Sequence, residues 1–264
     1  MKWTVLVDNR TDDSAMETEH GLSILLETNH RRILLDTGAS DLLIRNAKRL
    51  GVDLSTIDYV FISHGHSDHA GGLRYVMEKN NTAKIIVSPD AVKSQFFSKR
   101  MHLHSITTVW PEIAKERMLY VNESSSIDND LQIMAHIPQN HPMPKGNQHL
   151  FVLNADGKYN HDDFRHELAL YIDGLLFTGC AHSGLENILS ACPWPVHSVV
   201  GGFHLLDGQE SEEDLTALSK RLKAHYPDTR FYTSHCTGNH VFEIMKNVMG
   251  KQLISFSCGT IVLS

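Results

Sequence analysis

Several features that mark other classes of protein are missing from this sequence of 264 residues. It has no run of about 18 apolar residues, so no transmembrane helix is expected. It also has no long basic run and carries a formal net charge of −7, whereas nucleic-acid-binding proteins usually display a basic patch or stripe. We therefore expect neither a membrane nor a nucleic-acid partner, and the sequence leaves the oligomeric state open.

Cysteine is scarce, with four residues that all lie in the last third of the chain. Their scattered spacing is typical of reduced thiols in a cytoplasmic protein rather than of a disulfide framework. The first eight residues also turn polar too early for the apolar region of a signal peptide. We therefore predict a cytoplasmic location. The four cysteines are Cys180, Cys192, Cys236 and Cys258.

The composition is that of an ordinary globular protein, with 41% apolar residues, 8 Pro and 17 Gly. No linker or low-complexity segment divides the chain, so we predict a single domain over residues 1–264. Helices are expected over residues 41–50, 73–79, 185–191, 211–225 and 239–249, and after Ser88-Pro89. Strands are expected over residues 2–7, 21–27, 32–35, 59–62, 84–87, 106–109, 118–121, 131–135, 149–153, 166–172, 175–178, 195–200, 230–234, 252–256 and 260–263.

Histidine is abundant, with 18 residues, and several of them gather directly after the buried strand predicted at residues 59–62. His64, His66, Asp68 and His69 follow within six residues. Imidazole and carboxylate groups are the ligands that suit zinc, iron and manganese. On an extended segment His64 and His66 point the same way, because side chains alternate, and can reach one metal. Asp68 and His69 lie further on and can serve a second metal.

Other candidate groups follow later predicted strands. His182 lies just past a buried strand and before a helix, and His235 ends another strand. His204 follows the strand predicted at residues 195–200. Residues 166–167 enter a strand, and Cys180 precedes His182 by two positions. Because catalytic groups commonly cluster at strand ends in αβ architectures, we expect these positions to share one site.

The run His64-Gly-His66-Ser-Asp68-His69 matches the H-x-H-x-D-H signature of the metallo-β-lactamase superfamily, which the chain resembles as a whole. The resemblance implies an α/β fold, a four-layer αβ/βα sandwich with two sheets inside and helices outside. It implies that His64 and His66 hold a first metal together with a later histidine. It further implies that Asp68, His69 and His235 hold a second metal, and that Asp36 supports the metal loop.

The middle of the pattern departs from the common hydrolases of this superfamily. Their bridging aspartate usually ends a strand in a Thr-Gly-Asp step, whereas this chain reads Thr-Gly-Cys at residues 178–180. Either Cys180 replaces the bridge or His182 takes over ligation, and we prefer His182 as the third histidine. His166 is the second choice. We expect two divalent metal ions, with zinc favoured and manganese or iron as alternatives.

Five stretches together resemble the branch of the superfamily named for dihydropterin-ribofuranosyl-aminobenzene phosphate synthase. The match spans nearly the whole chain, but fold and branch do not fix a substrate. The five stretches are residues 5–9, 19–23, 178–184, 201–205 and 235–238.

The leading hypothesis is a hydrolase that uses a metal-activated water on a small anionic metabolite. A phosphoester is favoured, because backbone N–H groups at residues 237–238 begin a helix and could receive a phosphate. Asp68 and His204 are the candidate catalytic residues, although His204 could equally be a packed turn residue. We interpret Lys99, Arg100, His102 and His104 as solvated surface rather than as an anion site.

Two alternatives remain open. One is a synthase-like transferase that uses a phosphoribosyl donor, as the name of the branch suggests. The other is a non-catalytic protein that binds metal or a ligand on a hydrolase fold, and the intact histidine run argues against it.

Overall fold

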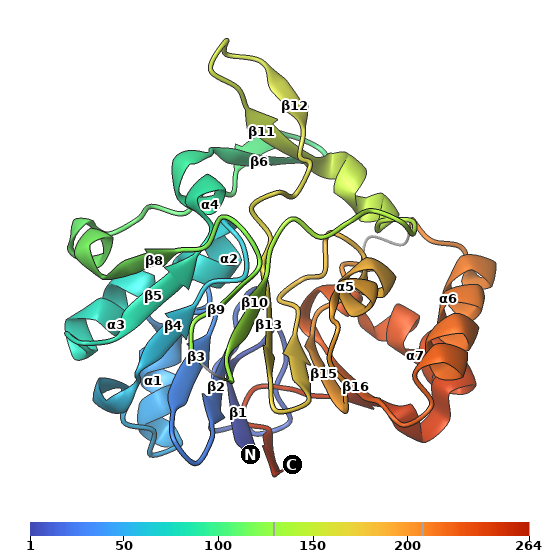
Figure 1. Cartoon of the computed structure of the whole chain (residues 1–264), viewed down its shortest axis with the longest axis horizontal. Helices are drawn as coiled ribbons and strands as arrows, with labels where there is room; N and C mark the ends of the chain where they lie inside the picture. The colour runs from blue at the N-terminus through green and yellow to red at the C-terminus, as the bar shows by residue number, and fades with distance from the viewer. Residues whose placement is uncertain (129, 207–208, 264) are drawn as a thin grey trace.

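Two seven-stranded sheets pack face to face, and helices cover the outer face of each (Figure 1). The computed structural model describes residues 1–128, 130–206 and 209–263. The arrangement is the predicted four-layer α/β sandwich. Both termini lie at the same edge of the molecule, opposite a small protruding sheet.

The first sheet is built mainly from the N-terminal half of the chain. Its β4 and β5 run parallel to β3, while β2 is antiparallel to both of its neighbours, β1 and β3. The last strand of the chain pairs with the first, so the C-terminus closes this sheet and not the second. In spatial order the strands are β18 (Ile261–Leu263), β1 (Lys2–Val7), β2 (Ser23–Glu27), β3 (Arg32–Leu35), β4 (Tyr59–Phe61), β5 (Lys84–Val87) and β8 (Met118–Tyr120).

The second sheet comes from the C-terminal half. Strands β14, β15, β16 and β17 are parallel to one another, so their carboxyl ends meet at one edge of the sheet. In spatial order the strands are β17 (Leu253–Ser255), β16 (Arg230–Thr233), β15 (Ser198–Gly201), β14 (Leu175–Phe177), β13 (Ala169–Ile172), β10 (Gln132–Met134) and β9 (Ser125–Ser126).

Alternating side chains place each strand between two apolar layers. In β3, Ile33 and Leu35 face the opposite sheet, whereas Leu34 packs against the outer helices. In β14, Phe177 contributes to the layer between the sheets and Leu176 to the layer beneath the helices. Full burial of each such side chain stabilises the fold by roughly 1.5–3 kcal/mol.

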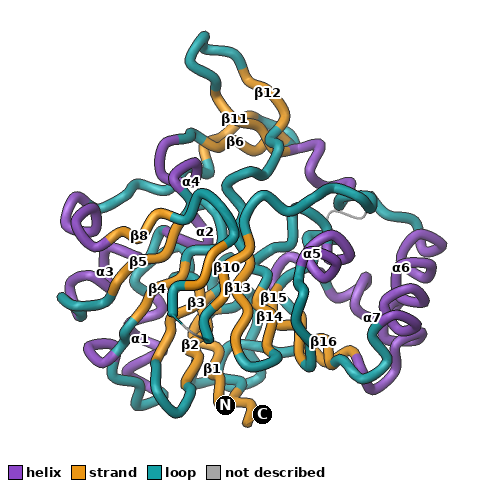
Figure 2. The backbone as a smooth tube through the Cα atoms, in the orientation of Figure 1, coloured by secondary structure: helices purple, strands orange, loops and turns teal. Residues whose placement is uncertain are grey.

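The helices divide between the two outer faces (Figure 2). In the described parts of the chain, no helix is both long enough and apolar enough to cross a bilayer. The helix predicted from residue 211 begins with a capping box, in which Ser211 and Asp214 exchange hydrogen bonds of 3.1 and 3.2 Å. The helices are α1 (Leu42–Arg49), α2 (Ser67–Ala70), α3 (Leu73–Lys79), α4 (Pro89–Lys93), α5 (Leu185–Ala191), α6 (Glu212–His225) and α7 (Asn239–Met249).

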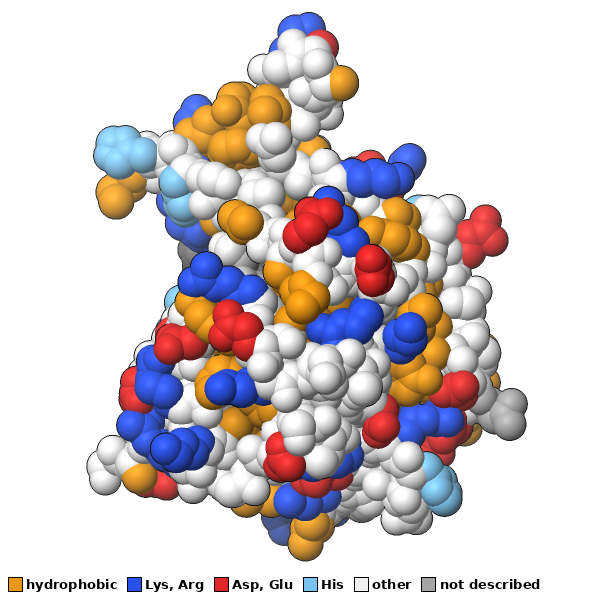
Figure 3. Space-filling model, turned by 90° about the vertical axis from the view of Figure 1, so that its left-hand side faces the viewer, with side chains coloured by type: hydrophobic (Ala, Val, Ile, Leu, Met, Phe, Trp, Pro, Cys, Tyr) orange, Lys and Arg blue, Asp and Glu red, His pale blue; other side chains and the backbone are white. Residues whose placement is uncertain are grey.

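A separate four-stranded sheet protrudes from the edge where the two large sheets meet (Figure 1). Hydrophobic side chains gather on it (Figure 3), and Met101, Leu103 and Tyr159 are exposed there. Its strands are β12 (Tyr159–His161), β11 (Leu150–Leu153), β6 (Phe96–Lys99) and β7 (Leu103–Ser105).

The strand predicted at residues 106–109 is wrong. The apolar residues there alternate, but the strand ends at Ser105 and Val109 is 88% exposed. The chain instead crosses to the histidine loop. The N–H of Ser67 donates to the carbonyl of Ile106 (2.8 Å), and the hydroxyl of Thr108 donates to the carbonyl of Gly65 (3.0 Å). Residues 106–108 therefore brace the histidine loop.

Candidate metal centre

The histidine run leaves the carboxyl end of β4 and turns into the short helix α2. His64 is fully buried and His66 is 4% exposed. Asp68 and His69 lie on α2, and the backbone of His66 is extended at its N-cap (φ −74°, ψ 143°). An extended segment followed by a helical turn therefore separates the two pairs of donor side chains, as the sequence predicts.

Asp36 anchors this loop, as the resemblance implies. Its carboxylate accepts hydrogen bonds from the backbone N–H and the hydroxyl of Ser63, both at 2.7 Å. The same carboxylate lies 2.7 Å from Nδ1 of His69. The Ser63 hydroxyl in turn lies 2.8 Å from Nδ1 of His64. Because both Nδ1 atoms are engaged, the Nε2 atoms of His64 and His69 are turned toward the site.

Glu167 has the corresponding role in the C-terminal half. Its buried carboxylate accepts the backbone N–H groups of His182 and Ser183, both at 2.7 Å. The amide oxygen of Asn147 lies 3.1 Å from Nδ1 of His182. These contacts fix the turn after β14 and the plane of the His182 ring. No local sequence pattern singles out Asn147.

His235 follows β16 and reaches across to the N-terminal half. Its Nδ1 lies 2.9 Å from the amide oxygen of Asn9, and its Nε2 lies 3.1 Å from Nε2 of His69 and 3.4 Å from a carboxylate oxygen of Asp68. His20, which is exposed, lies 3.3 Å from the same oxygen. Sequence reasoning did not identify His20 or Asn9 as members of the site, although both lie in stretches that carry the resemblance.

Four buried imidazoles have an Nε2 atom without any hydrogen-bond partner in the described protein: His64, His66, His182 and His204. An unpaired buried polar atom is costly unless something satisfies it. Donor atoms of His64, His66 and His182 lie within 4.8 Å of one another. This donor set fits a metal ion, because neutral imidazole Nε2 is a common metal ligand.

His166, the second choice for the third histidine, has no ring nitrogen free to bind a metal. Its Nδ1 accepts the backbone N–H of Gly65 at 3.1 Å, and its Nε2 lies 3.0 Å from the carboxylate of Asp162. Both ring nitrogens therefore hold the loop rather than face the cavity. His166 is a positioning residue.

Burial sets the protonation of most of these histidines. Burial, reinforced by neighbouring imidazoles, holds the pKa values of His64 and His182 well below the ordinary range and lowers the pKa of His66 to about 3. Without a metal, burial disfavours the charged form of His235, but the negative charges of Cys236 and Asp68 outweigh it and raise the pKa of His235 to about 9, so a metal bound there would displace the His235 proton. The first three imidazoles are thus neutral at pH 7, the form that binds metal.

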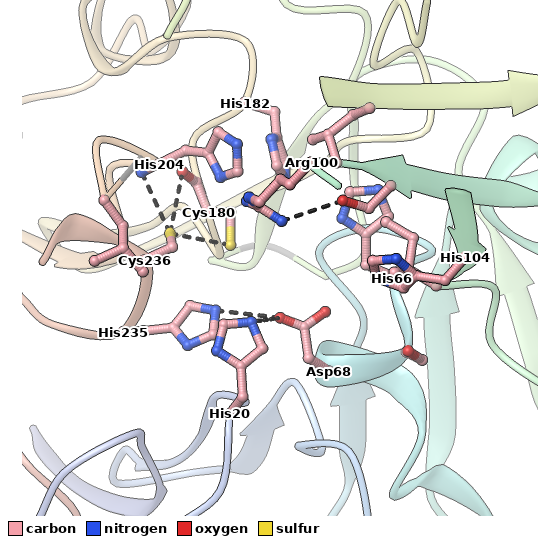
Figure 4. Close-up of a pocket in the computed structure, with 15 residues that line it drawn as sticks. His20, His66, Asp68, Arg100, His104, Cys180, His182, His204, His235 and Cys236 are labelled. Atoms are coloured by element: carbon pink, nitrogen blue, oxygen red, sulfur yellow. Dashed lines mark hydrogen bonds and ion pairs between the residues drawn. The ribbon is translucent and has the colours of Figure 1, made fainter. Parts of the chain in front are cut away.

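Four of the candidate metal ligands, His66, Asp68, His182 and His235, line a cavity of about 220 Å³, whereas His64 and His69 are fully buried and are not among its lining residues. Figure 4 shows side chains of both halves directed into it, with Arg100 and His104 entering from the β6–β7 hairpin. Arg100 and His104 are exposed, as the interpretation of the 99–104 basic group as solvated surface expects, but they also line the cavity. Lys99 and His102 are exposed and do not line the cavity.

The sulfur atoms of Cys180 and Cys236 also lie in this cavity, 3.2 Å apart. Sequence reasoning considered Cys180 but not Cys236. The expected phosphate site at residues 237–238 is not supported, because neither residue lines the cavity. The hydroxyl of Thr237 accepts the N–H of Phe203 at 3.0 Å and bonds to Thr233, so it has a structural role.

The chain is similar to known proteins over most of its length. The family model of the metallo-beta-lactamase superfamily matches residues 17–131. The chain is 31% identical over 238 residues to the uncharacterized protein MJ0448 of Methanocaldococcus jannaschii, covering 89% of this chain and 90% of that protein. It is 27% identical over 259 residues to the 7,8-dihydropterin-6-methyl-4-(beta-D-ribofuranosyl)-aminobenzene-5'-phosphate synthase of the same organism, covering 89% and 87%.

A solved structure is similar over the full length. The crystal structure of Tm1679, described as a metal-dependent hydrolase of the beta-lactamase superfamily, has a TM-score of 0.84 and 28% sequence identity. The match covers 100% of this chain and 99% of that one. The similarity therefore includes both sheets and the small protruding sheet, and not only the residues that the family model matches.

Proposed function

The chain belongs to the metallo-beta-lactamase superfamily, and on that premise we propose that it is a metal-dependent hydrolase of a small anionic metabolite, with a phosphoester as the favoured bond. Members of this superfamily bind divalent metals and are generally metal-dependent hydrolases.

The observation that carries the proposal is the cluster of buried imidazoles whose Nε2 atoms are unpaired. Three of them, on His64, His66 and His182, form a group whose donor atoms lie within 4.8 Å of one another. We assign these three residues to a first metal. They come from both halves of the chain, so the folded sandwich is needed to bring them together.

We assign Asp68, His69 and His235 to a second metal. The Nε2 atoms of His69 and His235 lie 3.1 Å apart, and Asp68 lies 3.6 and 3.4 Å from them. Burial opposes ionisation of Asp68, but the surrounding imidazoles hold its pKa well below the ordinary value. A permanently ionised carboxylate beside imidazoles suits zinc, with manganese and iron as alternatives.

Metal ions in such a site supply a water of lowered pKa and polarise the bond that is cleaved. The protein groups have their own roles. Asp68 can orient that water as a hydrogen-bond acceptor. His204, with its ring centroid 4.1 Å from that of His182 and its Nε2 unpaired, can hold the developing negative charge or give a proton to the leaving group.

Arg100 and His104 support an anionic substrate. They line the cavity opposite His20 and His235, as Figure 4 shows, and they come from the small sheet rather than from the two large ones. A guanidinium presents a planar fork of donors that matches the oxygen atoms of a phosphate. In this proposal Arg100 binds the phosphate of the substrate while the metals act on the bond to be cleaved.

A synthase-like transferase is the second candidate function. It is supported by 27% identity over most of the chain to the pterin-precursor synthase. Both candidates require an anionic phosphate-bearing substrate, so Arg100 has the same role in each. They differ in whether water or a second organic substrate attacks.

The test is hydrolysis by the full chain reconstituted with zinc or manganese. A panel of phosphomonoester, phosphodiester, lactone and thioester model substrates identifies the bond, and the phosphoribosyl donor with an aminobenzoate tests the transferase. We expect phosphoester hydrolysis that falls to background in His64→Ala and His182→Ala, with unchanged circular dichroism. Retained turnover in either variant would reject the hydrolase, and a condensation product without hydrolysis would favour the synthase.

A further inference from the structure

The sulfur of Cys180 lies at the centre of the donor cluster. It is 3.1 Å from Nε2 of His69. It also lies within 4.8 Å of donor atoms that we assign to different metals: His64 and His69 in one group, His182 in a second, and His235 in a third. One atom therefore has close neighbours among the donors of both proposed metals. This is the position in which a bridging ligand is needed.

Each of the carboxylates near Cys180 has contacts with other groups. Asp36 holds Ser63 and His69, and Glu167 holds the turn at His182. Asp162 accepts hydrogen bonds from Phe164 and lies 3.0 Å from His166. Asp68 lines the cavity beside His20 and His235. None of these groups takes the place of Cys180 between the two sets of imidazoles.

The backbone fixes the direction of the Cys180 side chain. Gly179 and Ala181, which flank it, both have a positive φ of 55°. A Cβ on Gly179 would lie 2.3 Å from the hydroxyl oxygen of Ser63, so the turn packs directly against the histidine loop. The N–H of Gly202 donates to the carbonyl of Gly179 at 2.6 Å. The buried sulfur, 3% exposed, is thus placed by a rigid turn and not by a mobile loop.

Cys236 contacts the sulfur of Cys180. Its sulfur is in hydrogen-bond contact with Sγ of Cys180 at 3.2 Å and accepts the backbone N–H of His204 at 3.3 Å. A Cβ on Gly202 would lie 2.3 Å from Sγ of Cys236, so only glycine leaves space for this thiol. A hydrogen bond to an ionised acceptor is about twice as strong as one between neutral groups. Cys236 is therefore suited to stabilise a Cys180 thiolate.

We propose that the Cys180 thiolate bridges the two metals, with Cys236 as its hydrogen-bond donor; this inference rests on the proposed two-metal function. On metal binding the S–H bond of Cys180 breaks, two metal–sulfur bonds form, and the proton passes to the sulfur of Cys236, 3.2 Å away, without any change of oxidation state. Because thiolate is a soft ligand, the bridge selects zinc over manganese or magnesium.

The test is titration of the chelator-stripped full chain with Co(II), under argon and with a phosphine reductant. Sulfur-to-cobalt charge transfer gives an absorption band in the near ultraviolet that does not depend on activity. A bridging thiolate predicts that the band grows with both the first and the second equivalent of cobalt. The band should be lost in Cys180→Ser and kept in Cys192→Ser, whose sulfur lies outside the site near the carbonyl of Trp194.

Two further variants keep the test decisive. Cys180→Asp should bind both cobalt ions without the band, and it replaces Cys180→Ser if that variant does not fold. Cys236→Ser should keep the band while metal affinity falls by about tenfold, as for other partners of a ligand. A band that persists in Cys180→Ser or Cys180→Asp, or that is lost in Cys236→Ser, overturns the proposal.

The outcomes separate this inference from the proposed function. Absence of cobalt uptake in equilibrium dialysis of the wild type would overturn the metal centre and the bridge together. Uptake of cobalt without the band would overturn only the sulfur bridge. A band that saturates at the first equivalent would make Cys180 a terminal ligand and would likewise overturn the bridge.

Discussion

The two halves of the sandwich supply their donor groups in different ways. The N-terminal half places His64, His66, Asp68 and His69 on one loop, which a single carboxylate supports. The C-terminal half supplies single residues from separate strand ends, and Ala181, His204 and His235 each have a positive φ of 50–55°. Hydrogen bonds to a buried carboxylate support the metal ligands in both halves, and in the C-terminal half the ligands additionally lie on turns of positive φ that packing maintains.

The difference follows from topology. In the second sheet β14, β15 and β16 are parallel, so the turns after these strands converge on one edge although they are far apart in sequence. Those turns carry Cys180 with His182, then His204, then His235 with Cys236. The N-terminal half therefore positions its metal ligands by a local sequence motif, and the C-terminal half positions its ligands by the arrangement of parallel strands.

The largest predicted effect comes from replacing the supporting carboxylate of each half. Asp36→Asn weakens the contacts that orient both His64 and His69, so we expect the affinity for both metals to fall about 10–100-fold. Glu167→Gln disturbs only the turn at His182, so we expect a comparable loss confined to the first metal. Isothermal titration with zinc measures both. Equal loss of both metals in Glu167→Gln would contradict the division of donors between the halves.

A smaller effect is expected from the small sheet, which belongs to neither half. Arg100→Ala should raise KM for a phosphate-bearing substrate about 10–100-fold, the worth of one charge-assisted hydrogen bond of about 1.5–3 kcal/mol. Metal content and kcat should change little, because Arg100 is not a proposed donor. Lys99→Ala is the matched control, since Lys99 is exposed and does not line the cavity. A fall in kcat with unchanged KM would show that Arg100 does not bind the ground-state substrate.

The smallest effect concerns a stabilising contact of the C-terminal half that lies outside the site. Hydrogen bonds from Lys145 and Ser211 lower the pKa of Asp214 to about 2 from the ordinary 3.8. Because the folded-state pKa is depressed, this stabilisation is present above pH 3.8 and is lost as the pH falls toward about 2.

Asp214→Asn should therefore lower Tm by a few degrees at neutral pH, and the difference from wild type should shrink below pH 3.8. Metal content should not change. Glu213→Gln, on the same helical turn but outside the capping box, serves as the control. A difference in Tm that stays constant down to acid pH would mean that the charge of Asp214 does not contribute.

The comparison of the halves also explains which parts of the site could be predicted from sequence. The 64–69 run could be identified because its donors are adjacent and follow an apolar strand. His182 and His235 were found because each follows a strand. His20, Asn9 and Asn147 were missed because their contacts depend on how distant segments meet; Asn9 and His235 are 226 residues apart.

Other predictions failed for a related reason. The place of Arg100 and His104 at the cavity could not be predicted, because nothing local indicates that the β6–β7 hairpin folds over the cavity. His166 is the second choice as a metal ligand from sequence because it enters a strand. Its two ring nitrogens instead form hydrogen bonds with Gly65 and Asp162. Most strands of the two large sheets are predictable from apolar periodicity, whereas β6, β7, β9 and β12 and the partner of each polar atom are not.

The central claim is that one two-metal centre is assembled from both halves of the chain. The most direct test is elemental analysis of protein purified without chelator, together with His182→Ala and with His225→Ala, an exposed histidine on α6, as control. We predict about two metal ions per chain in the wild type and the control, and about one in His182→Ala, as expected for a two-metal site. A wild type that binds no metal after reconstitution, or an unchanged metal content in His182→Ala, would contradict the account.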